Sequence, residues 1–146
     1  MSKKMFVLPG INIQWPWSDK ILMGKKKVET RTYDIPEKYR GKEMVIIETP
    51  GPLGKKLANI TSARMVGIVV FDKTYKYKDK KHWASEKILH CVEKTDKLFK
   101  FNPKKPKWAW KISYYKNFTK PLPAPKKRGI IFATSCRFPS DIITQS

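Results

Sequence analysis

The sequence predicts an α+β, mostly β fold, a small closed or nearly closed β-barrel with two or more short helices on its rim. Three observations favour it. About five to seven short segments have strand patterns, proline and glycine separate them at short intervals, and few segments have helical periodicity. The chain has 146 residues, of which 40% are hydrophobic, enough for one core. We therefore expect one domain over residues 1–146.

The N-terminal half contains strand candidates on either side of a short helix. Residues 5–8 and 11–15 are apolar and are separated by Pro9 and Gly10, which predicts two strands. Residues 16–24 have proline in the first helical turn and Gly24 just past the end, as short helices do. Further strands are expected at 27–32, 43–49 and 60–71, with a turn at 35–41, a loop at 50–56 and a possible bulge at Gly67.

The C-terminal half changes period. Ala84, Ile88, Cys91 and Val92 recur at helical spacing and predict one amphipathic helix over residues 80–94. After a basic stretch broken by prolines, residues 108–115 alternate as a half-buried strand does. The remaining residues predict an extended connector at 121–125, a last strand at 129–134 and a loose tail at 139–146.

The charge balance indicates a polyanionic partner. The chain has 32 lysines and arginines against 12 acidic residues, a net charge of +20, and lysine is much the commoner cation. Such a surface repels its own copies and attracts nucleic acid, so we expect a monomer that binds RNA or DNA. Because lysine attracts phosphate without reading bases in the bidentate manner of arginine, low sequence specificity is expected.

Several classes of protein are excluded by composition. The chain has no apolar run of about eighteen residues for a membrane span, and its two cysteines predict neither a disulfide framework nor a zinc site. The apolar run near the start is too short for a signal peptide, so we expect a cytoplasmic protein, with the nucleus as an alternative. His82, Glu86 and His90 share a helix face but span about 12 Å, so no metal site is expected, and no cofactor.

One short motif follows the first predicted helix. Residues 24–31 fit the pattern G-x-K-x-x-E-x-R through Gly24, Lys26, Glu29 and Arg31. The chain resembles the ASCH domain family, a branch of the PUA-like superfamily, over about residues 11–134. The other residues that support the resemblance are the Pro-Trp helix before the motif, residues 39–42 with the strand that follows, residues 108–112, Pro121 and Gly129.

The resemblance implies a PUA-like barrel with a cleft, lined by the motif, that suits RNA, DNA or a single nucleotide. Some members of the family are amidohydrolases that deacylate N4-acetylcytidine, and at least one relative looks like a ribonuclease. In the amidohydrolases the motif lysine works with a threonine three residues later and a glutamate from a helical region. Those positions are Lys26, Glu29 in place of the threonine, and Glu86, which would be the catalytic residues of an enzyme.

Strand geometry gives the motif a second interpretation. In a strand, Lys27, Glu29 and Arg31 project from one face, while Lys26, Val28 and Thr30 project from the other. Glu29 could then orient Arg31 and Lys26 toward a phosphate or a base edge, or act as a general base. The alternative is an ordinary ion pair on a surface strand, which would stabilise the fold by at most about 1 kcal/mol.

Two groups of residues are candidates for nucleic-acid contact. The five tryptophans are mostly expected in the core, but those beside the motif could stack bases. The predicted cleft consists of Trp15, Trp17, Lys26, Glu29, Thr30 and Arg31. The segment 73–81 interleaves lysine with tyrosine, which suits a single-stranded backbone, and its candidates are Lys73, Tyr75, Lys76 and Lys78. Further basic groups lie at 104–107 and 126–128.

Three functions remain open from the sequence. The first is a nucleic-acid-binding ASCH domain with low sequence specificity, supported by the motif and by the charge of +20. The second is a hydrolase that acts on RNA or on modified nucleosides such as N4-acetylcytidine. The third is a reader of modified bases, or an adaptor whose basic surface contacts a protein or the ribosome.

Overall fold

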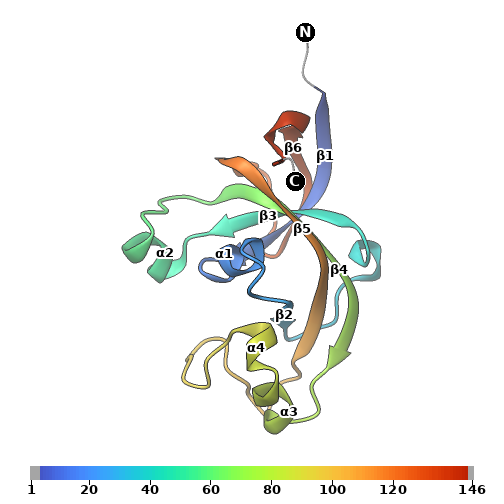
Figure 1. Ribbon diagram of the computed structural model, residues 1–146, viewed down its shortest axis with the longest axis vertical. Helices are drawn as coiled ribbons and strands as arrows, with labels where there is room; N and C mark the ends of the chain where they lie inside the picture. The colour runs from blue at the N-terminus through green and yellow to red at the C-terminus, as the bar shows by residue number, and fades with distance from the viewer. Residues whose placement is uncertain (1–3, 145–146) are drawn as a thin grey trace.

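Six strands and several short helices make up the fold (Figure 1). The computed structural model describes residues 4–144. The strands are β1 (Met5–Gln14), β2 (Val28–Arg31), β3 (Glu43–Thr49), β4 (Arg64–Lys76), β5 (Trp108–Pro123) and β6 (Phe132–Pro139). The helices are α1 (Trp17–Leu22), α2 (Gly51–Leu57), α3 (Lys80–Ser85) and α4 (Lys87–His90), with 3-10 turns η1 (Glu37–Tyr39) and η2 (Ser140–Ile142).

The strands form one mixed sheet in the order β2-β5-β4-β3-β1-β6. β1 runs parallel to β3, and the other neighbours are antiparallel. The predicted α+β class is therefore confirmed. The barrel does not close, because within residues 4–144 β2 and β6 are the two edge strands and do not pair with each other. β2 is only four residues long, and it pairs solely with the start of β5.

β3 is a central strand, as its apolar sequence predicted. Met44 and Ile46 face a core cluster that includes Trp110, whereas Val45 and Ile47 face a second cluster on the opposite side of the sheet. These four of the seven β3 side chains are fully buried. A strand that is covered on both faces has a continuous apolar sequence, and for this reason the bounds of β3 could be predicted correctly.

β1 is one continuous strand, so the prediction of two strands at 5–8 and 11–15 was wrong. Its pairing with β6 shifts register between Leu8 and Gly10, and this bulge admits Pro9 without ending the strand. A Cβ at Gly10 would lie 2.6 Å from Cys136 Sγ, so the close approach of β6 requires glycine there. The bulge expected near Gly67 is confirmed, since the register of β4 shifts on both of its sides between Met65 and Gly67.

The C-terminal strands are longer than predicted. Residues 121–123 are extended, but they continue β5 and pair with β4 through Leu122 and Met65, so they are no free connector. β6 begins at Phe132 and runs past the predicted end at 134. The tail was expected to be loose, yet Ile142 in η2 is buried and Ile143 bridges to Phe118. Residues 145 and 146 lie outside the described part of the chain.

The helices differ from the predictions at two places. Residues 50–56 were expected to form a loop, but most of them belong to α2, because Pro52 fits the first helical turn. The single helix expected over 80–94 is broken into α3 and α4, which end at Ser85 and His90. The break at Glu86 interrupts the helical period before Ile88, which is 83% exposed instead of facing the core. Cys91 has φ 64° and ends α4.

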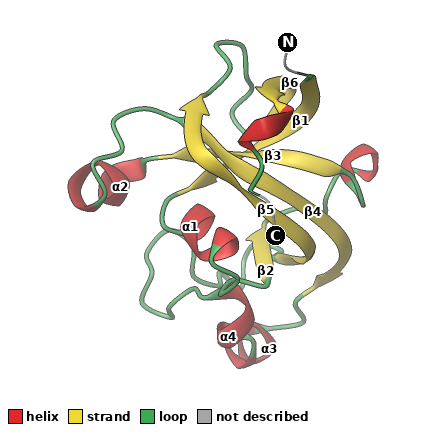
Figure 2. Cartoon of the chain, turned by 45° about the horizontal axis from the view of Figure 1, so that its top comes forward, coloured by secondary structure: helices red, strands yellow, loops and turns green. Residues whose placement is uncertain are grey.

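The helices lie around the sheet rather than in one layer. α3 and α4 lie together beyond the end of β2, and α2 lies apart from them (Figure 2). Trp83 of α3 and Val92 after α4 pack with Val28 and Ala109 in a third core cluster, which fixes this end of the sheet. No helix in residues 4–144 is long and apolar enough to cross a membrane.

Candidate functional site

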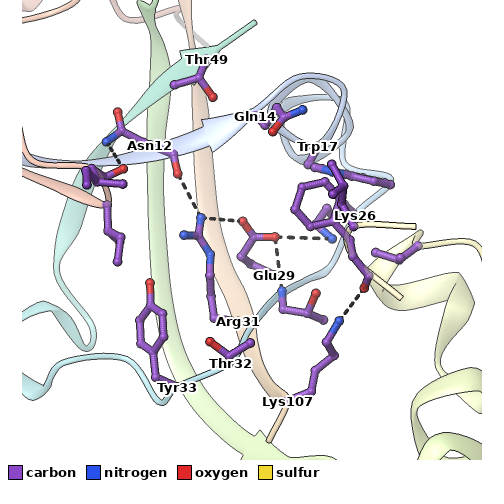
Figure 3. Close-up of a pocket in the computed structure, with 16 residues that line it drawn as sticks. Asn12, Gln14, Trp17, Lys26, Glu29, Arg31, Thr32, Tyr33, Thr49 and Lys107 are labelled. Atoms are coloured by element: carbon purple, nitrogen blue, oxygen red, sulfur yellow. Dashed lines mark hydrogen bonds and ion pairs between the residues drawn. The ribbon is translucent and has the colours of Figure 1, made fainter. Parts of the chain in front are cut away.

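A cavity of about 450 Å³ lies beside α1 and β2 (Figure 3). Its polar lining comes mainly from the ends of β1 and β2 and the residues that follow β2, namely Asn12, Gln14, Lys26, Glu29, Thr30, Arg31, Thr32, Tyr33, Thr49 and Lys107. Its apolar wall consists of Trp17, Val92, Leu98, Phe99, Ile130 and Ile131. The cavity therefore combines a charged floor with aromatic and aliphatic sides, as pockets for small organic groups commonly do.

The motif enters the cavity through the turn between α1 and β2. Gly24 has φ 76°, a left-handed conformation that glycine adopts without strain, and it ends α1. The backbone amides of Lys25 and Lys26 then donate to the carbonyl of Lys20. Lys26 therefore precedes β2, and its side chain reaches Glu29. The prediction that Lys26 projects from the opposite face to Glu29 was wrong. It assumed that the alternation of a strand extends back to Lys26, whereas β2 begins at Val28 and Lys26 lies in the preceding turn.

Three charged side chains of the motif converge on the floor of the cavity. One carboxylate oxygen of Glu29 is 3.0 Å from Arg31 Nη2, and the other is 3.5 Å from Lys26 Nζ (Figure 3). The side chain of Glu29 is 7% exposed, that of Arg31 is 18% exposed and that of Lys26 is 1% exposed. The three therefore form a buried network and not a surface ion pair. Lys26 Nζ also donates to the carbonyl of His90 at 2.5 Å, and Arg31 Nη2 donates to the carbonyl of Asn12 at 3.0 Å.

Burial and charge oppose each other in this network. Burial alone would raise the pKa of Glu29, but the charges of Arg31 and Lys26 outweigh it and hold that pKa below its ordinary value. Burial lowers the pKa of Lys26 even though Glu29 lies beside it. Burial would also lower the pKa of Arg31, yet Glu29 raises it above the usual range. Glu29 and Arg31 are thus an ionised pair, and Lys26 is the cation of this network that loses its proton more readily.

Lys107 is a further buried cation in the wall of the cavity. It is 8% exposed, and its Nζ donates to the carbonyls of Phe99 at 2.5 Å and Lys100 at 3.2 Å. Burial, followed by the charge of Lys26, lowers the pKa of Lys107 to about 8. The sequence placed Lys107 in an exposed basic stretch, and nothing in its local pattern indicated this position.

Two buried polar atoms of the lining have no hydrogen-bond partner within the described residues. They are Asn12 Oδ1 and the Tyr33 hydroxyl oxygen. Asn12 Nδ2 is satisfied, since it donates to the carbonyls of Gly129 and Ile130 at 2.9 and 2.8 Å. Buried polar groups are normally paired, so an acceptor and a hydroxyl in one cavity are available to bond to water or to a polar ligand.

Trp17 and Trp15 have different surroundings. Trp17 lines the cavity, meets Phe99 edge-on with ring centroids 5.9 Å apart, and lies 5.2 Å from Lys26 Nζ. Trp15 does not line the cavity; it lies against α2, where its Cβ would be 3.4 Å from a Cβ at Gly54. Of the predicted cleft residues, Trp17, Lys26, Glu29, Thr30 and Arg31 are brought together and Trp15 is not.

Glu86 lies outside the cavity lining, between α3 and α4. It accepts a hydrogen bond from the Tyr75 hydroxyl, and its Oε2 is 3.7 Å from His82 Nε2. Burial and the bond to Glu86 raise the pKa of Tyr75 to about 12. The structure therefore does not bring Glu86 to Lys26 and Glu29 as the resemblance to amidohydrolases implied.

The other predicted contact residues lie along the end of β4. Lys73, Lys76 and Lys78 are exposed, whereas Tyr75 is half-buried and packs edge-on against Tyr77 at 5.6 Å. None of them lines the cavity. Tyr75 is thus part of the packing around α3, and the three lysines form an exposed basic edge.

The fold is that of ASCH proteins. The structure is similar to that of an ASCH protein from Zymomonas mobilis, with a TM-score of 0.59 and 16% identity over 79% of this chain and 72% of that one. A serine-to-alanine mutant of that protein gives a TM-score of 0.62 at 15% identity over 86% of each chain. A tyrosine-to-phenylalanine mutant gives 0.58 at 16% identity over 79% of this chain and 74% of that one. No protein-family model matches the sequence, and no curated protein matches it significantly.

Proposed function

We propose that the chain binds RNA or other single-stranded nucleic acid with low sequence specificity, and that one unpaired base occupies the cavity. The observation that carries this proposal is the lining itself, in which an aromatic wall faces two unpaired polar atoms above a cationic floor. These are the features that hold a flat heterocycle with polar edges. The ASCH-like fold supports the proposal through the nucleic-acid binding that the resemblance implies.

The wall and the floor would contact different parts of a base. Trp17 and Phe99 offer an aromatic face and edge, and stacking on such a surface stabilises binding by about 1–3 kcal/mol for each base. Asn12 Oδ1 could accept a hydrogen bond from an amino group, and the Tyr33 hydroxyl could donate to a ring nitrogen or carbonyl. Every RNA base has an amino group or a ring N–H that could donate to Asn12, and a ring nitrogen or carbonyl that could accept from Tyr33, which agrees with low specificity.

The surface charge would bind the backbone. With a net charge of +20, the protein attracts phosphate over its whole surface, and each phosphate contact releases counterions. If about six lysines contact the phosphates of a single strand, affinity should fall about 300-fold between 50 and 200 mM salt. Fluorescence anisotropy with labelled single-stranded RNA, single-stranded DNA and duplexes of the same length measures this directly. Absence of binding at the lowest salt concentration would refute the proposal.

A hydrolase acting on RNA or a modified nucleoside is the second candidate function. The observation that favours it is the Lys26 amine, whose pKa is lowered by burial and which faces the cavity beside Glu29. Lys26 or Arg31 could stabilise the negative charge that develops during hydrolysis, and Glu29 could transfer a proton. Against the amidohydrolase form, Glu29 stands where that mechanism needs a threonine, and its carboxylate is occupied by Arg31 and Lys26.

The two candidates are separated by turnover. Purified protein is incubated with RNA and with N4-acetylcytidine, alongside the variants Lys26→Met and Glu86→Gln. Hydrolysis that is lost in Lys26→Met would establish an enzyme, whereas binding without turnover supports the first proposal. Loss of hydrolysis in Glu86→Gln would restore a role for Glu86 despite its position outside the cavity.

A further inference from the structure

A second hollow, of about 600 Å³, adjoins the cavity. The two share the lining residues Thr32, Leu98 and Lys107, so they lie next to each other. Besides Lys107, the second hollow is lined by the exposed lysines Lys80, Lys94, Lys97, Lys100 and Lys105. We call this hollow the lysine groove. None of the described residues that line it is acidic.

The lysines of the groove are free to contact a ligand. Within residues 4–144, Lys94, Lys97, Lys100 and Lys105 form no salt bridge. Asp96, an acidic residue of the same loop, bonds to the loop itself, because its Oδ1 accepts from the backbone amides of residues 98 and 99 at 2.9 and 2.8 Å. The groove therefore concentrates positive charge, and no salt bridge between described residues neutralises these four lysines.

The loop that carries these lysines is held in shape from within. Lys107 Nζ donates to the carbonyls of Phe99 and Lys100, and the side chain of Asn102 accepts from the amide of Lys104 at 3.0 Å. Lys107 is buried where the cavity meets the groove, so it contributes charge to both. Apolar surface from Phe101, Pro103 and Pro106 lies between the cations.

We propose that the lysine groove binds the sugar–phosphate backbone on one side of the base that occupies the cavity. This inference rests on the proposed function, and it adds the direction of the bound nucleic acid. The nucleic-acid strand leaves the cavity past Leu98 and Lys107 and continues toward Lys97, Lys100 and Lys105. Alternating cations and apolar side chains match the alternation of phosphate and ribose along a nucleic-acid strand. Because phosphates repeat on every nucleotide, the groove strengthens binding without reading sequence.

A matched pair of variants tests the groove. In the first, Lys94, Lys97, Lys100 and Lys105 are replaced by alanine. In the second, four exposed lysines outside both hollows are replaced, namely Lys42, Lys55, Lys56 and Lys120. Both variants lose the same charge. For single-stranded RNA, the slope of log affinity against log salt should become less steep by about 3 in the groove variant, since each lost contact to a single strand contributes about 0.7. In the control variant this slope should change by less than about 1.

A second probe separates backbone from base. Oligomers with one base and a growing number of abasic nucleotides on one side should bind the wild-type protein and the control variant with increasing affinity, but the groove variant with nearly constant affinity. Equal effects of the two variants on slope and on the abasic series would overturn the groove proposal while leaving base binding intact. Failure of the wild-type protein to bind any oligomer at low salt would overturn the proposed function itself.

Discussion

Glu29 accepts a hydrogen bond from Arg31 at 3.0 Å, and both residues lie on one face of the four-residue strand β2. On an exposed strand this pair would add little to stability, but here the Glu29 side chain is 7% exposed and also pairs with Lys26. Removal of the carboxylate charge would leave two buried cations facing each other. The pair thus connects the stability of the fold with the shape of the cavity floor.

The substitution Glu29→Gln should lower the free energy of unfolding by about 3 kcal/mol, because it leaves buried charges unpaired. Urea denaturation measures this. The matched control is Glu37→Gln, which removes a carboxylate that also pairs with an arginine, Arg40, but whose side chain is 83% exposed. The control should cost less than about 1 kcal/mol. Equal costs at the two positions would show that the cavity floor is not a buried network.

The contribution of Glu29 should depend on pH. Its pKa is lowered in the folded protein, so the stability that it provides is fully present above the ordinary value of 4.5 and is lost as the pH falls through the folded value. The difference in unfolding free energy between wild type and Glu29→Gln should therefore shrink in acid. A difference that stays constant from pH 7 to pH 3 would contradict the lowered pKa.

Lys107 should act in the opposite part of the pH range. Its pKa is lowered from 10.5 to about 8, so between these values the unfolded chain binds more protons than the folded one, and the contribution of Lys107 to stability rises with pH. Denaturation of wild type and Lys107→Met across pH 7.5 to 10.5 tests this. As the pH rises, the free energy of unfolding of the wild type should increase relative to that of the variant. If the two free energies change in parallel with pH, the lowered pKa of Lys107 is refuted.

Two exposed apolar side chains at the mouth of the cavity should matter for binding but not for folding. Leu98 and Ile130 are 76% and 97% exposed. Replacing both by alanine should change the free energy of unfolding by less than about 0.5 kcal/mol, yet it should weaken binding of single-stranded RNA about tenfold through lost apolar contact. The control replaces Leu57 and Ile88, which are 65% and 83% exposed and do not line the cavity. A loss of affinity in the control would contradict this role of the mouth.

Local sequence patterns predicted the parts of the fold that depend on near neighbours. β3 is apolar on both faces and was placed correctly, and α1 is bounded by Pro16 and Gly24 as short helices are. The convergence of Glu29 and Arg31 followed from the two-residue period of a strand. The position of Lys26 did not follow, because it depends on the turn that Gly24 makes.

The rest of the site depends on contacts between distant segments. Asn12 comes from β1, Phe99 and Lys107 come from the loop before β5, and Ile130 precedes β6, so no spacing along the chain links them to the motif. The break between α3 and α4 likewise depends on tertiary packing, since Trp83 and His90 stack with ring centroids 4.7 Å apart. The prolines of the segment 121–123 predicted a connector, but pairing with the distant strand β4 makes this segment part of β5.

The most direct test of the cavity as the binding site for a base is the fluorescence of Trp17. A base that stacks in the cavity should quench this indole when single-stranded RNA is added at low salt. The quench should persist in Trp15→Phe, because Trp15 does not line the cavity, and it should largely disappear in Trp17→Phe. A full quench in Trp17→Phe together with its loss in Trp15→Phe would place the bound base elsewhere and contradict the proposal.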